Sequence, residues 1–282
     1  MMNTKKCSVL SYGVMSMIML SSASAATVAY YRFEDNLTNS ANPGTGDLTA
    51  TGSVTTTSLA GSGATSDFFN PVPQTGASNT QTASGFSGSE NNGFSTGDFF
   101  DLSGNDAFTI EALFNASSTS NIQTIAAQWL TVSGGRSFYF NVRDGGQLAL
   151  YASGDGNNAE TYISNTSGLQ ATAGKDYYAA AAFSTSGVSL YLQNLTDGGP
   201  LSSQSFNVNL TNVRNSGGDF TVGGFNNNFN YAFSGSIDEV RLSDTKLSES
   251  ELLTVPEPSS FLLALIAGGV GVLVLRRNRC GK

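Results

Sequence analysis

Between Thr27 and Lys246 the sequence alternates apolar and polar residues in short runs, and clusters of Gly, Asn, Ser and Asp separate these runs. A period of two places the apolar side chains of a strand on one face, whereas an amphipathic helix needs apolar residues three and four positions apart. This stretch sustains no such helical spacing. The pattern therefore predicts an all-β fold, a two-sheet antiparallel jelly-roll sandwich.

Two pairs of alternating runs predict β-hairpins. Residues 137–142 and 147–152 flank Arg143-Asp144-Gly145-Gly146, whose glycines can adopt the positive φ of a tight turn. Residues 177–183 and 188–193 flank a turn of Ser, Thr and Gly in the same way. These four runs supply adjacent antiparallel strands.

The remaining segments complete the predicted sandwich. Residues 109–114 and 220–223 predict further strands. Residues 61–97 are rich in Ser, Thr, Asn and Gly, which predicts irregular chain interrupted by one or two strands. Residues 246–254 predict a brief helical turn.

Both ends of the chain differ from the middle. At the start, two lysines precede an apolar run and Ala23-Ser24-Ala25, which is typical of a cleavable signal peptide over residues 1–25; a buried helix is the alternative. Near the end, residues 261–275 are apolar and long enough, with the two preceding serines, to predict one transmembrane helix. The basic residues after it predict a cytoplasmic C-terminus, and a buried core helix is again the alternative.

Three features follow one another at the C-terminus: Pro256-Glu257-Pro258, the apolar span, and a basic cluster of Arg276, Arg277 and Arg279. Together with the signal peptide, this order resembles the PEP-CTERM sorting signal of Gram-negative bacteria. The resemblance implies recognition by the membrane protease-transpeptidase exosortase, with processing near the two prolines. It also implies display on the cell envelope or surface, or release into the extracellular matrix.

The predicted organisation is a signal peptide (1–25), a β-domain (26–247), a linker (248–255) and a sorting signal with its transmembrane helix and basic tail (256–282). Cys7 and Cys280 both fall outside the β-domain, so no disulfide is expected within it. Its stability must then come from a large core, or from a bound ion.

Composition excludes several functions. The chain has no histidine, which rules out a Ser-His-Asp triad, a Cys-His pair and any His-ligated metal centre. Residues 26–254 hold 20 of the 21 acidic residues but only 7 of the 13 basic ones. Phosphate binding needs a dense basic patch, so no nucleic-acid partner is expected.

The β-domain also resembles a known family. The segments that carry the resemblance are YYRFED from Tyr30, FTIEALFNASS from Phe108, YYAAAAFSTSGVSLYLQNL from Tyr177, and the closing stretch from Phe220 that contains SGSIDEVRLSD. They are similar to laminin G-like members of the concanavalin A-like lectin/glucanase superfamily. The resemblance implies the same two-sheet sandwich.

Related glucanases carry catalytic carboxylates on one strand, and the matching strand here is residues 234–241. Simple alternation places Ser236, Asp238 and Val240 on one face and Glu239 on the other, so the two acids are not expected to face a substrate together. The acid-x-acid-x-acid spacing is also absent. The chain is therefore not expected to be an enzyme.

Laminin G-like domains often hold a structural calcium ion between the N-terminal loop and the last strands. By motif position, the resemblance implies that Glu34, Asn39, Asn42 and Asp238 would ligate it. The alternative is that Asp238 hydrogen-bonds to a neighbouring loop while Glu239 pairs with an arginine, Arg241 or Arg32.

Two loops mix aromatic side chains with amides and acids, the combination that binds sugars by stacking and hydrogen bonding. The candidate ligand-binding residues are Asn226, Asn228, Tyr231, Tyr151 and Tyr162. The alternative is an ordinary polar loop held by its aromatic residues. Trp129, which lies among alanines and a leucine, is expected in the core.

These observations predict a non-catalytic exported protein that binds or organises extracellular polysaccharide or another matrix component. A structural or adhesive envelope protein without a discrete ligand is the second hypothesis, and a glycoside hydrolase is the third.

Overall fold

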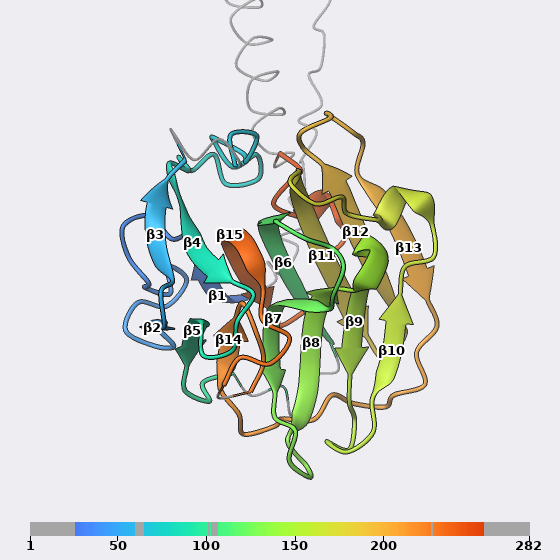
Figure 1. Cartoon of the computed structure of the whole chain (residues 1–282). Coiled ribbons are helices and arrows are strands. Elements are labelled where there is room, and N and C mark those ends of the chain that lie inside the picture. Colours follow the sequence, from blue (N-terminus) through green and yellow to red (C-terminus); the bar gives the residue numbers. More distant parts are fainter. Residues whose placement is uncertain (1–25, 60–64, 101, 103–106, 227, 257–282) are drawn as a thin grey trace, which may run out of the picture.

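A computed structural model describes residues 26–59, 65–100, 102, 107–226 and 228–256. Within them the chain forms two antiparallel sheets and three short 3₁₀ helices (Figure 1). This confirms the predicted all-β, two-sheet antiparallel sandwich. None of the helices in the described part of the chain has the length and apolar character that a membrane span requires.

One sheet has eight strands and the other has seven. The eight-stranded sheet runs in the order β13 (Ser202–Phe206), β12 (Gly187–Asn194), β11 (Asp176–Ser184), β6 (Ala107–Ala116), β15 (Ser234–Ser243), β4 (Gln81–Ser87) and β3 (Thr55–Ser58), with β1 (Thr27–Tyr31) also paired to β15. The seven-stranded sheet runs in the order β10 (Glu160–Ile163), β9 (Leu148–Ala152), β8 (Arg136–Val142), β7 (Gln123–Trp129), β14 (Phe220–Val222), β5 (Gly93–Thr96) and β2 (Thr49–Thr51). Each sheet thus ends in strands of three to five residues.

Both predicted hairpins are present. The first joins β8 to β9 through a 3₁₀ turn at Asp144–Gly146, and the second joins β11 to β12. Gly146 has φ 82°, and a Cβ there would lie 1.9 Å from the carbonyl oxygen of Ala171. Only glycine fits that close approach, so this residue fixes the turn between β8 and β9.

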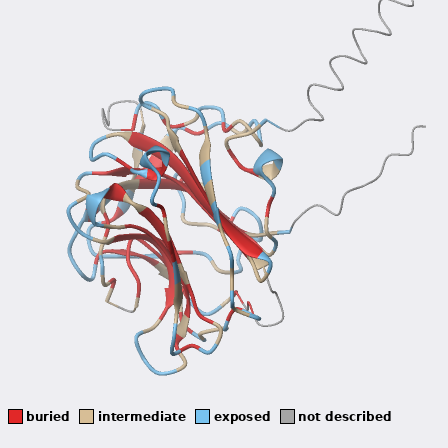
Figure 2. Cartoon of the chain, turned by 90° about the vertical axis from the view of Figure 1, so that its right-hand side faces the viewer, coloured by how far each residue is buried: buried red, intermediate tan, exposed pale blue. Residues whose placement is uncertain are grey.

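The main core lies between the two sheets and is made of the inward-facing residues of alternate positions. On β8, for example, Phe138, Phe140 and Val142 are fully buried in it. Phe138 packs against Phe108 of β6 with ring centroids 4.7 Å apart, which joins one sheet to the other. Figure 2 shows both sheets as buried layers beneath a more exposed rim of loops.

A second cluster covers the outer face of the eight-stranded sheet. Phe68 and Val72, from the segment before β4, and Leu252 and Leu253, near the end of the described chain, pack on this face beside Tyr178 of β11. The predicted helical turn is present as a 3₁₀ helix at Glu249–Glu251 with a capping box. The segment that the sequence assigns to a linker (248–255) therefore lies against the sheet.

The predicted signal peptide, the sorting signal after Pro256 and the transmembrane segment all lie outside the described residues. This includes Glu257, Pro258 and the three arginines of the basic tail.

Candidate functional site

Five aromatic side chains form a cluster on the outer face of the seven-stranded sheet, on the side away from the main core. We call this cluster the outer aromatic surface; its members are Trp129, Tyr139, Tyr151, Phe225 and Tyr231. Trp129, Tyr139 and Tyr151 come from β7, β8 and β9, and the other two come from the loop between β14 and β15. Alternation explains their position, because Phe138 and Phe140 point inward and Tyr139 between them must point outward.

The rings of the outer aromatic surface touch one another in series. Tyr139 stacks on Tyr151 with centroids 4.3 Å apart and an interplanar angle of 12°. Trp129 meets Tyr139 edge-on at 5.1 Å, and Phe225 lies 5.3 Å from Tyr139. Phe225 in turn meets the ring of Tyr231 at 5.3 Å. Residues from four separate segments of the chain therefore form one continuous aromatic layer.

The members of this layer differ in exposure. Trp129 and Tyr139 are only 7% and 6% exposed, and Arg136 lies over the Trp129 ring at 5.6 Å. Trp129 is thus buried, as expected, but it lies on the outer face of the sheet and not in the main core. Tyr231 is 50% exposed, and among the described residues it and Val132 are the large apolar side chains that face solvent. Tyr231 is therefore the most exposed ring of the outer aromatic surface.

The loop that carries Tyr231 is held in place at several points. Tyr231 has φ 47°, and its carbonyl accepts a hydrogen bond of 2.8 Å from the backbone N–H of Thr124. Asn226 Nδ2 donates to Thr131 Oγ1 at 3.0 Å, and its Oδ1 accepts from the Thr131 N–H at 3.2 Å. The carbonyl of Asn228 accepts from the Asn91 N–H at 2.8 Å. The two predicted asparagines therefore position the loop beneath the exposed tyrosine.

Tyr231 also lines a hollow of about 540 Å³ where four loops meet. Its lining residues are Gly88, Glu90, Ser118, Ser120, Asn121, Ile122, Gln123, Asp144, Tyr231, Ala232 and Ser234. Among these described residues two are acidic and none is basic. Asn230 Nδ2 donates to Glu90 Oε1 at 2.6 Å, which fixes one of the acids. The hollow thus combines hydroxyl, amide and carboxylate groups with one exposed ring.

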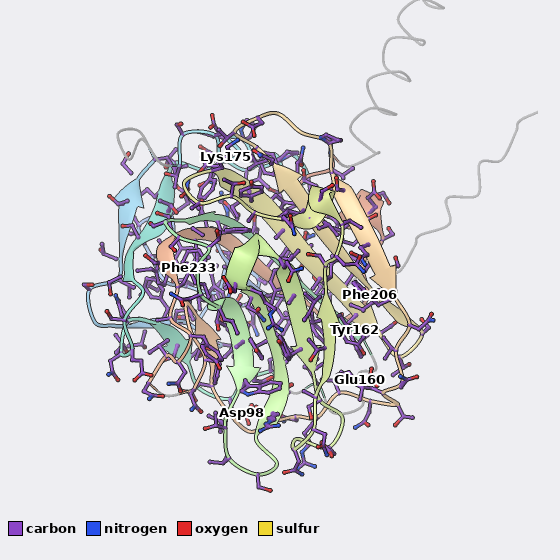
Figure 3. All side chains as sticks on the ribbon, turned by 45° about the vertical axis from the view of Figure 1, so that its right-hand side comes forward. Asp98, Glu160, Tyr162, Lys175, Phe206 and Phe233 are labelled. Carbon is purple, nitrogen blue, oxygen red and sulfur yellow. The ribbon has the colours of Figure 1, made fainter. Side chains whose placement is uncertain are left out.

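Not all predicted ligand-binding residues meet here. Tyr151 belongs to the outer aromatic surface, and its hydroxyl accepts a hydrogen bond of 2.6 Å from Arg143 Nη1. Tyr162 instead lies in the main core, 4% exposed, with its ring near Phe206 at 6.0 Å and its hydroxyl donating to Glu160 Oε2 at 2.5 Å (Figure 3). The structure therefore separates Tyr162 from the other candidates.

A second hollow of about 430 Å³ lies beside Asp155 and Glu160. Hydrogen bonds from the backbone N–H groups of Asn158 and Asn157 lower the pKa of the Asp155 carboxyl, which these loop contacts already occupy. No aromatic side chain is among the described residues that line this hollow. It therefore lacks the stacking surface found beside Tyr231.

The alternation expected for β15 is wrong at Asp238 and Glu239. The register with β6 shifts between Asp238 and Arg241, and Glu239 has φ 48°, which is the geometry of a β-bulge. The extra residue puts Ile237 and Val240 in the core, and Asp238 and Glu239 both lie on the outer side. The two acids are therefore neighbours on one side of the sheet.

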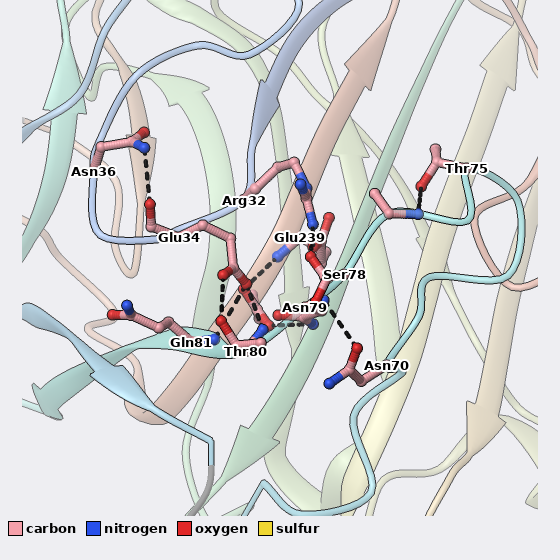
Figure 4. Close-up of polar contacts among 12 residues, drawn as sticks. Arg32, Glu34, Asn36, Asn70, Thr75, Ser78, Asn79, Thr80, Gln81 and Glu239 are labelled. Atoms are coloured by element: carbon pink, nitrogen blue, oxygen red, sulfur yellow. Dashed lines mark hydrogen bonds and ion pairs between the residues drawn. The ribbon is translucent and has the colours of Figure 1, made fainter.

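These two carboxyl groups are covered by protein, and Figure 4 shows Arg32 next to Glu239. Asn79 Nδ2 donates to Asp238 Oδ2 at 2.8 Å, and Arg32 Nη2 pairs with Glu239 Oε1 at 3.2 Å. Both contacts match the alternative to calcium binding, in which Asp238 hydrogen-bonds to a neighbouring loop and Glu239 pairs with Arg32. Burial and the charge of Glu239 raise the pKa of Asp238 well above its usual range.

The residues that the family resemblance assigns to calcium already bond within the protein. Glu34 accepts hydrogen bonds from Thr80 and Gln81 (Figure 4), and the Asn39 side-chain oxygen accepts from the N–H groups of Tyr30 and Ala41. Asn42 is exposed.

In the described part of the chain no group of three or more Asp, Glu, Cys or His side chains is arranged to hold a metal ion. As folded, Glu34, Asn39, Asn42 and Asp238 do not fit an ion unless these hydrogen bonds are exchanged. Calcium binding therefore stays a prediction, and no function is derived from it.

Comparison with known proteins supports the fold. Residues 86–253, more than half of the chain, match a family model described as the concanavalin A-like lectin/glucanases superfamily. Among curated proteins, none matches the chain in sequence.

Many solved structures are similar, and two serve as examples. One is domain 4 of AbnA, a GH43 extracellular arabinanase from Geobacillus stearothermophilus in complex with arabinotriose: TM-score 0.51, 14% identity, covering 82% of this chain and 97% of that one. The other is the botulinum neurotoxin serotype D binding domain: TM-score 0.51, 12% identity, covering 80% of this chain and 50% of that one. The chain thus spans half the length of the toxin domain. At these identities the likeness shows the shared fold.

Proposed function

The chain belongs to the concanavalin A-like lectin/glucanases superfamily, and from this we propose that it is an exported, non-catalytic protein that binds extracellular polysaccharide through the outer aromatic surface. The half-exposed ring of Tyr231, set on a continuous layer of aromatic side chains beside a polar hollow, is the observation that carries the proposal. The arabinotriose complex of the similar arabinanase domain is consistent with such a role.

The chemistry of the site suits a sugar. The apolar face of a saccharide ring packs against an aromatic ring, and fixed polar groups beside that ring can bond its hydroxyls. Tyr231 supplies the ring, and Gln123, Asn121 and the neighbouring serines supply amide and hydroxyl groups. The ring layer beneath Tyr231 keeps its loop from collapsing, so little ordering is needed on binding.

Charge favours a neutral ligand. Glu90 and Asp144 line the hollow without a basic residue among its described lining, and the chain has a formal net charge of −8. An anionic polymer would be repelled at this position. We therefore assign the site to neutral saccharides.

Export and anchoring are part of the proposal and rest on the sequence. The signal peptide over residues 1–25 would direct the chain across the membrane, and residues 261–275 would hold it there until exosortase acts near Pro256-Glu257-Pro258. The β-domain would then be displayed on the envelope or released into the matrix of a Gram-negative bacterium. The hydrophobic segment and its arginines support this arrangement.

The absence of catalysis is likewise proposed. The bulge in β15 places Asp238 and Glu239 on the same side of the sheet, but both are fully buried beneath Arg32 and the loop around Asn79. A glycosidase needs two carboxyl groups that flank a reachable glycosidic bond. Covered acids of this kind support a binding role.

The proposal is tested with Tyr231→Ala on a panel of neutral oligosaccharides and polysaccharides. Removing the exposed ring should weaken binding tenfold or more, about 1.4 kcal/mol, because the stacking area is lost. Val132→Ala is the matched control, since Val132 is also exposed but lies outside the outer aromatic surface. Titration calorimetry on the best ligand measures both variants.

Three outcomes would contradict the proposal. If Tyr231→Ala binds a saccharide as tightly as wild type does, the outer aromatic surface is not the binding site. Turnover of a glucan would show that the protein is a hydrolase. Absence of binding to every neutral saccharide would favour the structural or adhesive envelope protein without a discrete ligand.

A further inference from the structure

Beside the outer aromatic surface lie two polar side chains whose burial has no evident reason. Thr124 of β7 and Asn141 of β8 are both 0% exposed. Neither the Oγ1 of Thr124 nor the Nδ2 or Oδ1 of Asn141 has a hydrogen-bond partner among the described residues. A buried polar group left without a partner costs about 1–3 kcal/mol, and native proteins keep few of them.

The strand register places these groups side by side. Asn141 is the cross-strand partner of Thr124 on one side and of Ala149 on the other. All three point to the outer face, because their neighbours Val142, Ile125 and Leu150 are in the main core. Ala149 is small, apolar and fully buried, so it offers the amide of Asn141 no polar partner from β9.

Tyrosine and arginine side chains enclose this row. Tyr151 is the partner of Tyr139, two residues before Asn141 on β8, and Arg143 is two residues after it. The Arg143–Tyr151 hydrogen bond of 2.6 Å therefore crosses above the Asn141–Ala149 row. On the other side, the backbone of Tyr231 bonds to the backbone of Thr124.

Tyr139 lies at the centre of this enclosure. Burial raises the pKa of its hydroxyl, and Tyr151, Tyr231 and Arg143 all lie close enough to affect that shift. The unpartnered amide is thus enclosed by the same side chains that we assign to sugar binding.

We propose that Thr124 and Asn141 form a hydrogen-bonding subsite for two neighbouring hydroxyls of a neutral saccharide, reached when the Arg143–Tyr151 pair moves aside. This inference rests on the proposed function. An amide can donate from Nδ2 to one hydroxyl and accept at Oδ1 from the next, which matches a vicinal diol. The Thr124 hydroxyl can serve either partner.

The subsite also explains the cover above it. The Arg143–Tyr151 pair is one hydrogen bond between half-buried side chains, so little is lost when it opens. Once open, the guanidinium and the phenol hydroxyl are free to bond the outer hydroxyls of the sugar. Binding energy gained at the buried amide then compensates for opening the pair.

Asn141→Leu tests the subsite, because leucine has the same branched arrangement of side-chain heavy atoms but no polar group. The saccharide that binds the wild-type protein should bind this variant at least tenfold more weakly, while the melting temperature should rise. Ser137→Ala is the control, since Ser137 is on the same outer face of β8 and its buried hydroxyl is also without a partner. It should bind as wild type does.

A deoxy analogue of the saccharide adds a second measurement. If Asn141 bonds the diol, Asn141→Leu should weaken the binding of an analogue that lacks one of the two hydroxyls by a smaller factor than it weakens the binding of the intact saccharide. If Asn141→Leu fails to fold, Thr124→Val is the second test. Valine keeps the shape of the threonine side chain but lacks its hydroxyl, so this variant should bind the saccharide severalfold more weakly than wild type.

The outcomes separate this inference from the function beneath it. Normal affinity in Asn141→Leu together with loss in Tyr231→Ala would overturn the subsite and leave the proposed function standing; a tightly held water at the amide would give this result. If the wild-type protein binds no neutral saccharide, both fail.

Discussion

Asp176, at the start of β11, is a buried carboxyl without a basic partner among its described contacts. It is 2% exposed, and its oxygens accept hydrogen bonds from Asn115 Nδ2 at 2.6 Å and from the Asp67 N–H at 3.0 Å. Burial raises its pKa above the ordinary value, and the charge of Asp67 adds to that effect. A carboxyl whose pKa is raised by folding stabilises the protein when it is protonated.

The stability that Asp176 contributes to the folded protein falls as pH rises. The contribution of Asp176 is fully present below about pH 4, where an unfolded aspartate is protonated, and is lost as pH rises through its folded pKa. Asp176→Asn keeps the size of the side chain but removes the titration. We therefore expect the wild type to lose stability relative to Asp176→Asn as pH rises from about 4 to 7.

Urea unfolding of the two proteins at several pH values measures this difference. A stability difference that stays constant over the whole range would show that the pKa of Asp176 is the same in the folded and unfolded states.

Glu239 shows where residue-level prediction fails. Period-two alternation assigned Ile237 and Glu239 to one face, but a bulge with left-handed φ at Glu239 shifts every later residue of β15. Such a conformation costs a non-glycine residue of the order of 1–3 kcal/mol, and no local sequence signal for it is present. Contacts with Arg32, more than 200 positions away, hold it in place.

At the scale of elements, a buried ion pair attaches the last described segment to the eight-stranded sheet. Arg241 of β15 bonds to Glu111 of β6 at 2.5 Å and to the carbonyl of Glu251 at 2.7 Å. Glu111 also accepts from the Leu253 N–H at 2.9 Å and from the Tyr178 hydroxyl at 2.5 Å. One carboxylate thus links three parts of the chain.

Removing one partner should leave an uncompensated buried charge. We expect Arg241→Met to lower the free energy of unfolding by about 3–5 kcal/mol. Amide hydrogen exchange in residues 249–256 should also accelerate, because that segment loses its anchor. Urea unfolding and exchange rates measure the two effects.

The double variant Glu111→Gln/Arg241→Met serves as the control. It leaves no buried charge, and a glutamine can still accept from Leu253, so most of the lost stability should return. A double variant as unstable as Arg241→Met would show that packing of the arginine, and not charge, matters here.

Elements with strong local patterns were predictable, and their assembly was not. The alternating runs predicted β8, β9, β11 and β12, and both hairpins are confirmed. The same alternation places Tyr139 and Asn141 on the opposite face of β8, yet the sequence does not reveal that Phe225 packs against Tyr139 and brings Tyr231 next to it. That contact depends on the register of β7, which its own bulges set.

At the scale of the whole molecule, the N-terminal strands complete the fold. β1 pairs with β15 through Tyr30 and Arg241, and β4 pairs with the first half of the same strand, as the neighbouring blue and orange strands of Figure 1 show. The family model begins only at residue 86 and so omits β1 to β3 and most of β4. β1 and β15 are about 200 residues apart in the sequence, so local patterns cannot predict that they pair.

A chain that contains only residues 86–256 should therefore fail to fold cooperatively. It would leave most of the β15 edge that faces away from β6 without a partner strand, and it would remove Tyr31, Phe33 and Val54 from the core. Near-ultraviolet circular dichroism and a thermal melt, beside residues 26–256 as reference, measure the difference. A sharp melt with native aromatic signals in the shorter chain would contradict this expectation.

The short edge strands have a consequence for contacts between copies of this protein. β2, β3, β10 and β13 end the two sheets with three to five residues each, and all but β10 are rich in Ser and Thr. So short an edge offers another chain little backbone to extend. Copies of the β-domain that meet can therefore touch without adding strand to strand, and we expect them to stay separate molecules and not to grow into fibrils.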